Sequence, residues 1–158
     1  MRLVGASVLI VTTRWRGDAL GLTATAVCSV SADPPHLLAC INRDAEAHDA
    51  IRASGRFAVS LLAARHRELA ERFAGRSGVN GPARFAEGRW VEGRLGVPVL
   101  ADASAILECT VEHRLPVASH TVFVGKVVHA LASDTDEVLA YRDGTYGRFA
   151  PEPTRLTI

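Results

Sequence analysis

The chain has 158 residues, of which 48% are hydrophobic and 22% charged, and its formal net charge is +1. These values predict one soluble globular domain, 1–158, that is large enough to bury its core without cross-links. They do not support electrostatic attraction to nucleic acid or anionic membrane, and no apolar run approaches the roughly 18 residues that span a bilayer.

The N-terminal part of the chain predicts a buried strand followed by a hairpin turn. Val4 to Thr13 is dense in β-branched residues, which favour strands. The apolar run is too short for a signal peptide, and Thr12 to Arg14 stands where a small-residue cleavage site would be needed. Arg14 to Ala19 contains a Gly-Asp pair and predicts the turn into the next strand.

The stretch from Gly21 to Arg43 is the centre of the pattern. Its hydroxyl residues between Thr23 and Ser31 stand at odd positions and would share one face of a continuous strand, with apolar residues on the other. Such a strand suits a flat polar ligand, although the residues alone favour an ordinary half-exposed strand. Asp33 to Pro35 ends it, because proline cannot donate to a ladder. His36 to Ile41 predicts a strand buried on both faces.

Two helices are predicted next. Asp44 is the expected N-cap of the first, and Gly55 is the expected left-handed residue at its end. A strand, Arg56 to Leu62, separates it from a second helix, in which apolar residues from Leu62 to Phe73 follow helical spacing until Gly75.

The remaining chain predicts a long loop and then a β-rich half. Arg76 to Gly96 is rich in glycine and arginine and predicts a functional or mobile loop with at most a short strand near Trp90. Further strands are predicted at Pro98 to Leu100, Ser104 to Arg114, Ser119 to Ala132, Glu137 to Arg142 and Thr145 to Phe149, with a possible edge at Arg155 to Ile158. Six to eight strands with two short helices favour a mainly β barrel over a βαβ sheet.

The sequence contains no recognisable side-chain catalytic motif. Cys28, Cys40 and Cys109 are odd in number and stand in apolar contexts, which predicts reduced, buried thiols in a cytoplasmic protein. The histidines form no H-x-x-x-H pair, and neither C-x-x-C nor G-x-S-x-G occurs, so no metal site and no serine hydrolase is predicted. An enzyme on this fold would depend on a cofactor for its chemistry.

The chain resembles a known family through a series of short motifs in the same order. They are Thr23–Ala26, Ser29–Ser31, Asp33–Pro35, Asn42–Arg43, His48, Ser54–Phe57, Leu69–Gly75, Arg84–Phe85, Leu107–Cys109, His120–Gly125 and Tyr141–Tyr146. Together they resemble the short-chain flavin reductases, the NAD(P)H:flavin oxidoreductase components of two-component flavin-dependent monooxygenases.

The resemblance implies a Greek-key split β-barrel of the FMN-binding type, with two or three short helices, that forms homodimers. It also implies hydride transfer from NADH or NADPH to FAD or FMN, after which reduced flavin leaves for a separate monooxygenase. The site residues that it implies are His120 as the catalytic residue and, for cofactor binding, Thr23, Ala24, Thr25, Ala26, Ser29, Cys40, Asn42, Arg43, His48, Arg84, Phe85 and Tyr146.

These residues have distinct implied roles. Thr23 to Ala26 and Ser29 would line the isoalloxazine ring and ribityl chain, with Cys40 and Asn42 beside them. Arg43 and Arg84 would neutralise flavin phosphate, because arginine makes bidentate phosphate contacts.

His48 would favour an anion near the start of the first helix, and Phe85 would cover the flavin. His120 would face the reacting side of the flavin near the nicotinamide, and Tyr146 would contact the dinucleotide. Each has a structural alternative: an exposed or capping histidine for His48, a loop-packing anchor for Phe85, a structural strand-start histidine for His120 and a half-buried strand aromatic for Tyr146.

The chain also departs from the family pattern. Ala118 and Ser119 replace the Gly-Asp that often precedes the His-Thr pair, Ser60 replaces a common asparagine, and the usual N-terminal helix is missing. Two alternative functions stay open. One is a non-catalytic flavin- or tetrapyrrole-binding carrier or sensor; the other is an oxidase of the pyridoxamine-phosphate type, which would need a denser basic phosphate site.

Overall fold

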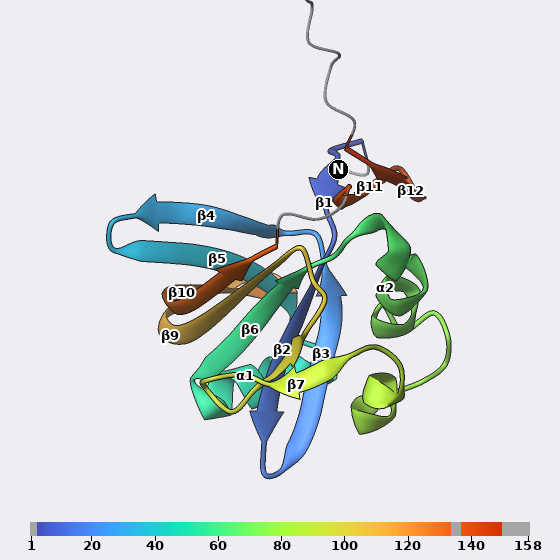
Figure 1. Cartoon of the computed structure of the whole chain (residues 1–158). Coiled ribbons are helices and arrows are strands. Elements are labelled where there is room, and N and C mark those ends of the chain that lie inside the picture. Colours follow the sequence, from blue (N-terminus) through green and yellow to red (C-terminus); the bar gives the residue numbers. More distant parts are fainter. Residues whose placement is uncertain (1–2, 134–136, 150–158) are drawn as a thin grey trace, which may run out of the picture.

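The structure, a computed structural model, describes residues 3–133 and 137–149, and its fold is mainly antiparallel β (Figure 1). The strands are β1 Ala6–Ser7, β2 Leu9–Trp15, β3 Asp18–Ala24, β4 Val27–Ala32, β5 Pro35–Asn42, β6 Arg56–Leu61, β7 Trp90–Glu92, β8 Pro98–Leu100, β9 Ala105–Val117, β10 His120–Ala132, β11 Leu139–Arg142 and β12 Thr145–Arg148. The helices are α1 Glu46–Ser54 and α2 Arg67–Phe73, with 3-10 turns η1 Ala64–His66 and η2 Gly81–Ala86. The predicted edge at 155–158 lies outside the described residues.

The main sheet has seven strands in the order β3-β2-β6-β9-β10-β5-β4. A second sheet, β1-β11-β12, lies near η1 and α2, and β7 pairs with β8 in a third (Figure 1). Hairpins and antiparallel ladders replace the parallel crossovers of a βαβ fold. The expectation of a mainly β fold with short helices is therefore confirmed.

The two edge strands of the main sheet, β3 and β4, are joined by only two residues, Thr25 and Ala26. The Cα atoms of Ala24 and Val27 can therefore be no more than about 11 Å apart. A flat seven-stranded sheet would hold its edges much farther apart, so the sheet must curl, and β3 indeed contacts β5. No ladder joins β3 to β4, which leaves the barrel split along this connection, hereafter the seam.

The seam corrects the prediction for the central stretch. That prediction placed Thr23, Thr25, Ser29 and Ser31 on one face of a single strand. The structure has two strands instead, because β3 pairs with β2 whereas β4 pairs with β5. A register shift between Ser29 and Ser31 further interrupts the alternation of side chains. The predicted continuous hydroxyl face does not exist.

Several other local predictions are also corrected. β5 alternates between buried residues, such as Leu37 and Ile41, and partly exposed ones, so it is not buried on both faces. Helix α1 has Ala45 as its N-cap, because the Asp44 N–H donates to Asn42 Oδ1 in a turn before the helix. Its C-terminal prediction is confirmed, since Gly55 has φ 68°.

The predicted second helix and long loop are only partly regular. Leu62 precedes a 3-10 turn, and the α-helix begins at Arg67. The loop contains η2 as well as the short strand at Trp90. The thiol of Cys28 is exposed and Cys40 is half-buried, so the prediction of buried cysteines holds only for Cys109. Burial raises the pKa of the Cys109 thiol to about 12.

The hydrophobic core has two parts because β2 is buried on both faces. Leu9 and Val11 pack inside the curled sheet with residues such as Phe57 and Phe123. Val8 and Ile10 pack on its other side, in the cluster that includes residues of α2 and β8. This second cluster fixes α2 beside β3, and the candidate site lies along that junction.

Candidate functional site

Two adjoining cavities lie where β3, the end of β5 and the end of α2 meet. The larger has a volume of about 360 Å³ and is lined by Leu22, Thr23, Asn42, Asp44, Ala45, Glu46, Phe73, Ala74, Asn80 and Arg84. The smaller has about 130 Å³ and is lined by Val8, Thr23, Thr25, Ala74, Arg76, Tyr141 and Tyr146. Thr23 and Ala74 border both cavities, which together form the site groove. Five predicted site residues therefore meet here: Thr23, Thr25, Asn42, Arg84 and Tyr146.

The seam supplies unpaired backbone donors at this groove. The Ala26 carbonyl accepts the Cys40 N–H at 2.9 Å. In contrast, the N–H groups of Thr25 and Ala26 have no acceptor within residues 3–133 and 137–149. Both residues are exposed, so these donors can bind a ligand's polar edge. The Thr23 hydroxyl donates to the Ala70 carbonyl at 2.6 Å, which leaves its oxygen free to accept.

Asn42 links the groove to the end of the β9–β10 hairpin. Its Oδ1 accepts the Asp44 N–H at 3.1 Å, and its side chain borders the larger cavity. Across the ladder, Asn42 stands opposite His120. The His120 ring is exposed and lies 2.9 Å from Ser119 Oγ, outside the lining of both cavities. His120 is thus beside the groove, one strand away.

The two arginines predicted at the phosphate have different surroundings. Arg84 is buried, and its guanidinium donates to the carbonyls of Gly21 and Val79, each at 2.9 Å. It therefore holds the 79–86 segment against β3 while still bordering the larger cavity. The Arg43 guanidinium is exposed and donates to the Ala118 carbonyl at the β9–β10 turn. It does not line either cavity.

His48 and Phe85 occupy packed positions. His48 is buried, with Nε2 2.9 Å from Thr121 Oγ1 and Nδ1 3.1 Å from Asp49 Oδ1, so it ties α1 to β10. Phe85 makes edge contacts with Phe73 and Trp90, with ring centroids 5.0 and 4.9 Å apart. Neither side chain borders the groove. Phe85 occupies a packing position in its loop, whereas His48 is a buried residue that neither caps α1 nor is exposed.

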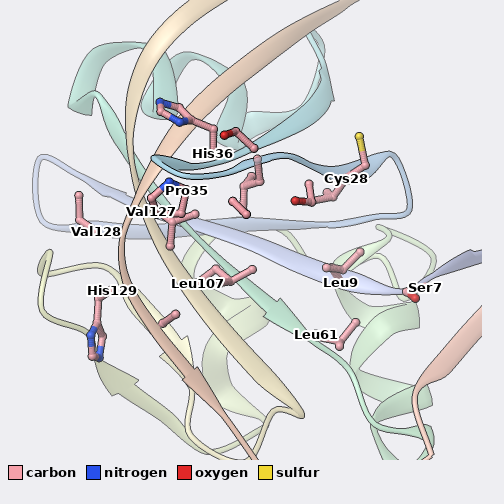
Figure 2. Close-up of a pocket in the computed structure, with 16 residues that line it drawn as sticks. Ser7, Leu9, Cys28, Pro35, His36, Leu61, Leu107, Val127, Val128 and His129 are labelled. Carbon is pink, nitrogen blue, oxygen red and sulfur yellow. The ribbon is translucent and has the colours of Figure 1, made fainter.

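Ser29 lies in a different cavity from Thr23. This apolar hollow, about 620 Å³, is bordered by β4, β5, β9 and β10, and by Leu9 and Leu61 (Figure 2). Cys28 and His36 also line it. Cys40, on β5, stands opposite Val122 on β10. It lines neither the hollow nor the groove. Burial, followed by the nearby Cys28 thiol, raises the pKa of Cys40.

An ion pair at the edge of the apolar hollow predicts a pH-dependent contribution to stability. His36 Nε2 lies 2.7 Å from Glu112 Oε2, and His36 Nδ1 lies 2.9 Å from the Pro34 carbonyl. The Pro34 contact first, and then Glu112, raise the pKa of His36 above 6.5, while the His36 hydrogen bond lowers the pKa of Glu112 below 4.5. The ion pair therefore stabilises the folded protein fully between pH 4.5 and pH 6.5, the ordinary pKa values of the two groups. This stabilisation is lost as the pH rises through the raised pKa of His36, and also as the pH falls through the lowered pKa of Glu112.

A double-mutant cycle with His36→Gln and Glu112→Gln measures this contribution. We expect a larger coupling free energy at about pH 5.5 than at about pH 8.5, because His36 loses its charge between them. The Glu137–Arg148 pair, whose atoms lie 2.6 Å apart and which contains no histidine, serves as the control at both pH values. Equal coupling of His36 and Glu112 at the two pH values would contradict the prediction.

Sequence reasoning missed several residues that border the groove. Arg76 and Tyr141 line the smaller cavity, and Asn80 and Glu46 line the larger. Tyr141 could have been found, because the predicted hairpin around Asp143 and Gly144 pairs it directly with Tyr146. Asn80 could not, because it stands in a loop without periodicity. Glu46 accepts the Gly81 N–H at 2.8 Å, a contact between segments distant in sequence.

The described residues contain neither a metal-binding cluster nor a membrane-spanning helix. Within 3–133 and 137–149, no group of three or more His, Cys, Asp or Glu side chains could hold a metal ion. In the same part of the chain, no helix combines the length and apolarity needed to cross a bilayer.

Comparisons with known proteins identify the class of this fold. A family model described as "Flavin reductase like domain" matches residues 1–150. The FMN reductase (NADH) RutF of Variovorax paradoxus is 37% identical over 153 residues, which cover 97% of this chain and 84% of that protein. RutF of Stutzerimonas stutzeri is 36% identical, with coverage of 92% and 83%.

Solved structures agree. The NADH:FAD oxidoreductase SgcE6 of Streptomyces globisporus, in complex with NAD and FAD fragments, has a TM-score of 0.87 at 33% identity and covers 96% of this chain and 89% of its own. BorF, the flavin reductase component of a bacterial two-component tryptophan halogenase, has a TM-score of 0.86 at 30% identity, with coverage of 94% and 92%. The fold is the split barrel of the flavin reductases. This chain belongs to the flavin reductase-like family.

Proposed function

We propose that this protein is an NAD(P)H-dependent flavin reductase that transfers hydride from a reduced nicotinamide to FAD or FMN. The observation that carries the proposal is the family match over 1–150 combined with a groove at the seam. Thr23, Thr25 and Asn42 supply the hydroxyl and amide groups of that groove. The relatives named above as FMN reductases and as an NADH:FAD oxidoreductase support the same activity.

The groove residues fit a flavin. A flavin needs donors at the edge of its ring, a flat surface of small residues and polar groups for its ribityl chain. The free N–H groups at Thr25 and Ala26 meet the first need, and Ala45 with Ala74 gives the larger cavity small side chains, whereas Ala24 is buried in the core. The Thr23 oxygen and the Asn42 amide meet the third. Flavin supplies the hydride-accepting chemistry when bound, and the chain binds and orients it.

His120 is proposed to act beside the nicotinamide. Its place opposite Asn42, at the turn end of the β9–β10 hairpin, leaves the imidazole exposed next to the groove. From there it can donate or accept a hydrogen bond and fix the orientation of the dinucleotide. Orienting two reactants in this way supplies up to about 7–11 kcal/mol of barrier reduction without a dedicated proton donor.

The activity is tested by the oxidation of NADH, followed by its absorbance at 340 nm with free FMN or FAD. We expect turnover that depends on both the dinucleotide and the flavin, with NADPH and riboflavin assayed in parallel. Catalase and an anaerobic arm separate flavin reduction from reoxidation by oxygen. Absence of turnover with every dinucleotide and flavin pair would rule the reductase out, and a copurifying flavin that NADH does not reduce would favour a carrier.

We further propose that the protein is a cytoplasmic homodimer that passes reduced flavin to a separate monooxygenase. Large apolar side chains are exposed on β4, β9 and β10: Val30, Leu115, Val117, Val128 and Leu131. Val128 lines the apolar hollow of Figure 2, and a second copy would cover these exposed side chains. Three free cysteines suit a reducing compartment. Light scattering during size exclusion measures the mass, and a monomer at micromolar concentration would contradict the dimer.

A further inference from the structure

Two arginines and two tyrosines form a cluster at the outer side of the smaller cavity. Tyr141 and Tyr146 are paired across the β11–β12 hairpin, and their ring centroids lie 5.1 Å apart. The Arg67 guanidinium lies 5.5 Å from the Tyr146 ring, and the Arg76 guanidinium lies 5.9 Å from the Tyr141 ring. Arg67 begins α2, whereas Arg76 follows its end. The cluster thus joins the second sheet to the α2 segment.

The cluster carries an excess of positive charge. Glu71 Oε1 lies 3.4 Å from Arg67 Nε and partly offsets that residue. Arg76 donates from Nη2 to Tyr141 Oη at 3.2 Å, and no carboxylate among the described residues lies within ion-pair distance of it. Since a guanidinium has five N–H groups, Arg76 keeps several donors for a ligand while its face stays near the tyrosine ring.

The two cavities of the groove differ in charge. The larger one is bordered by two carboxylates, Asp44 and Glu46, and by one arginine, Arg84, whose guanidinium already donates to backbone carbonyls. The excess of carboxylates would repel a phosphate. The smaller one is bordered by Arg76 together with hydroxyl residues, and no carboxylate lines it. Its volume of about 130 Å³ is well below the roughly 300 Å³ at which sites for whole organic ligands begin. The smaller cavity suits one compact anionic group of a ligand that extends beyond it.

We propose that Arg76, Tyr141 and Tyr146, with Arg67 behind them, form a phosphate-binding subsite of the reductase. The inference rests on the proposed function only for the identity of the ligand. Arg76 donates to phosphate oxygens, and the Tyr141 and Tyr146 hydroxyls and those of Thr23 and Thr25 supply further donors around the smaller cavity. The phosphate belongs either to the nicotinamide dinucleotide or to the flavin.

The subsite is tested with Arg76→Met, which keeps the length of the side chain and removes its charge. Arg142→Met is the matched control, because Arg142 is exposed on the same hairpin and does not line the smaller cavity. Thermal melting checks that both variants fold. Calorimetry measures the binding of ADP-ribose, FMN and riboflavin, and steady-state kinetics measures KM and kcat for NADH.

Loss of one charge-assisted contact is expected to weaken the phosphate-bearing ligand by about 10- to 100-fold in Arg76→Met alone. If the phosphate belongs to the dinucleotide, ADP-ribose affinity falls and KM for NADH rises, while kcat and the FMN-to-riboflavin affinity ratio are unchanged. If it belongs to the flavin, FMN affinity falls towards that of riboflavin, and ADP-ribose is unaffected.

Equal affinities of Arg76→Met and Arg142→Met for each of the three ligands would overturn the subsite. An unmodified protein that binds neither ADP-ribose nor FMN would also overturn it. These outcomes are independent of turnover. If the unmodified protein binds FMN or ADP-ribose but does not oxidise NADH, the reductase activity fails, and the comparison of the two variants still decides the subsite.

Discussion

Replacement of Ala74 by tryptophan is expected to lower kcat/KM for FMN reduction by roughly 100-fold, because displacement of bound reactants by even 1 Å has effects of this size. Ala74 borders both cavities of the site groove, and its small side chain leaves them connected. It is exposed, with φ −77° and ψ −1° at the end of α2, so an indole is compatible with its backbone. The indole would occupy the junction at Thr23.

The matched control is Ala83→Trp. Ala83 is exposed in η2 and lines neither cavity, so the same increase in side-chain size should leave kcat/KM within about twofold of the unmodified protein. Steady-state rates of NADH oxidation at varied FMN, together with thermal melting of both variants, give the comparison. Full activity in a folded Ala74→Trp protein would show that the flavin does not bind in this groove.

Substitution of Gly125 by alanine is expected to lower the free energy of unfolding by at least about 1–3 kcal/mol, because it overpacks a filled core. A Cβ atom on Gly125 would lie 2.7 Å from Phe57 Cζ and 2.8 Å from Cys109 Cβ. Both neighbours are completely buried, and the β10 register shifts next to Gly125. Neither the ring nor the strand can move away without disturbing the sheet.

Gly147→Ala is the control for this substitution. Gly147 lies in β12, where an added Cβ would meet no atom within 4 Å, so its effect should stay within about 0.5 kcal/mol. Urea unfolding followed by circular dichroism gives both free energies. Equal midpoints for the two variants would mean that the core around Phe57 is looser than its contacts indicate.

The strands of the C-terminal half were predictable because their signals are local. The β9–β10 hairpin combines a dense β-branched sequence with a short turn, and the hairpin around Asp143 and Gly144 has turn residues between two strand patterns. Gly55 ends α1 because a left-handed residue is needed there. In each case a few neighbouring residues determine the conformation, so the sequence pattern is sufficient.

The seam was not predictable in the same way. Small and hydroxyl residues alternate through Thr25 and Ala26 without interruption, and the chain breaks only because the strands on each side have different partners. The start of α1 was missed for a related reason. Asp44 is a good capping residue, but the Asn42 side chain binds its N–H first and delays the helix to Glu46.

The candidate site was predictable from the family motifs more than from residue chemistry. Thr23, Thr25 and Asn42 meet in space, but only the fold brings β5 and β3 together. Arg84 was predicted as a phosphate ligand, while its donors to Gly21 and Val79 depend on the path of a loop that has no sequence signature.

Long-range polar contacts escape sequence analysis for the same physical reason. Glu108 lies in the first half of β9 with 1% exposure, and its carboxylate accepts the N–H groups of Arg94 and Leu95 at 3.0 and 2.8 Å. A glutamate in a β-rich stretch suggests a solvated strand face. Its burial becomes understandable only when the β7–β8 turn, whose Arg94 and Leu95 N–H groups need an acceptor, is placed against it.

The two-residue link between β3 and β4 also limits how sequences of this fold can change in length. One inserted residue there would push one rim of the sheet away from the other, or turn every side chain of β4 to the opposite face. The short segment at Ser77 and Gly78 has no such restriction, because both residues are exposed and neither lines the site groove. Insertions and deletions among related proteins are therefore expected to accumulate in that segment, while the link keeps its length.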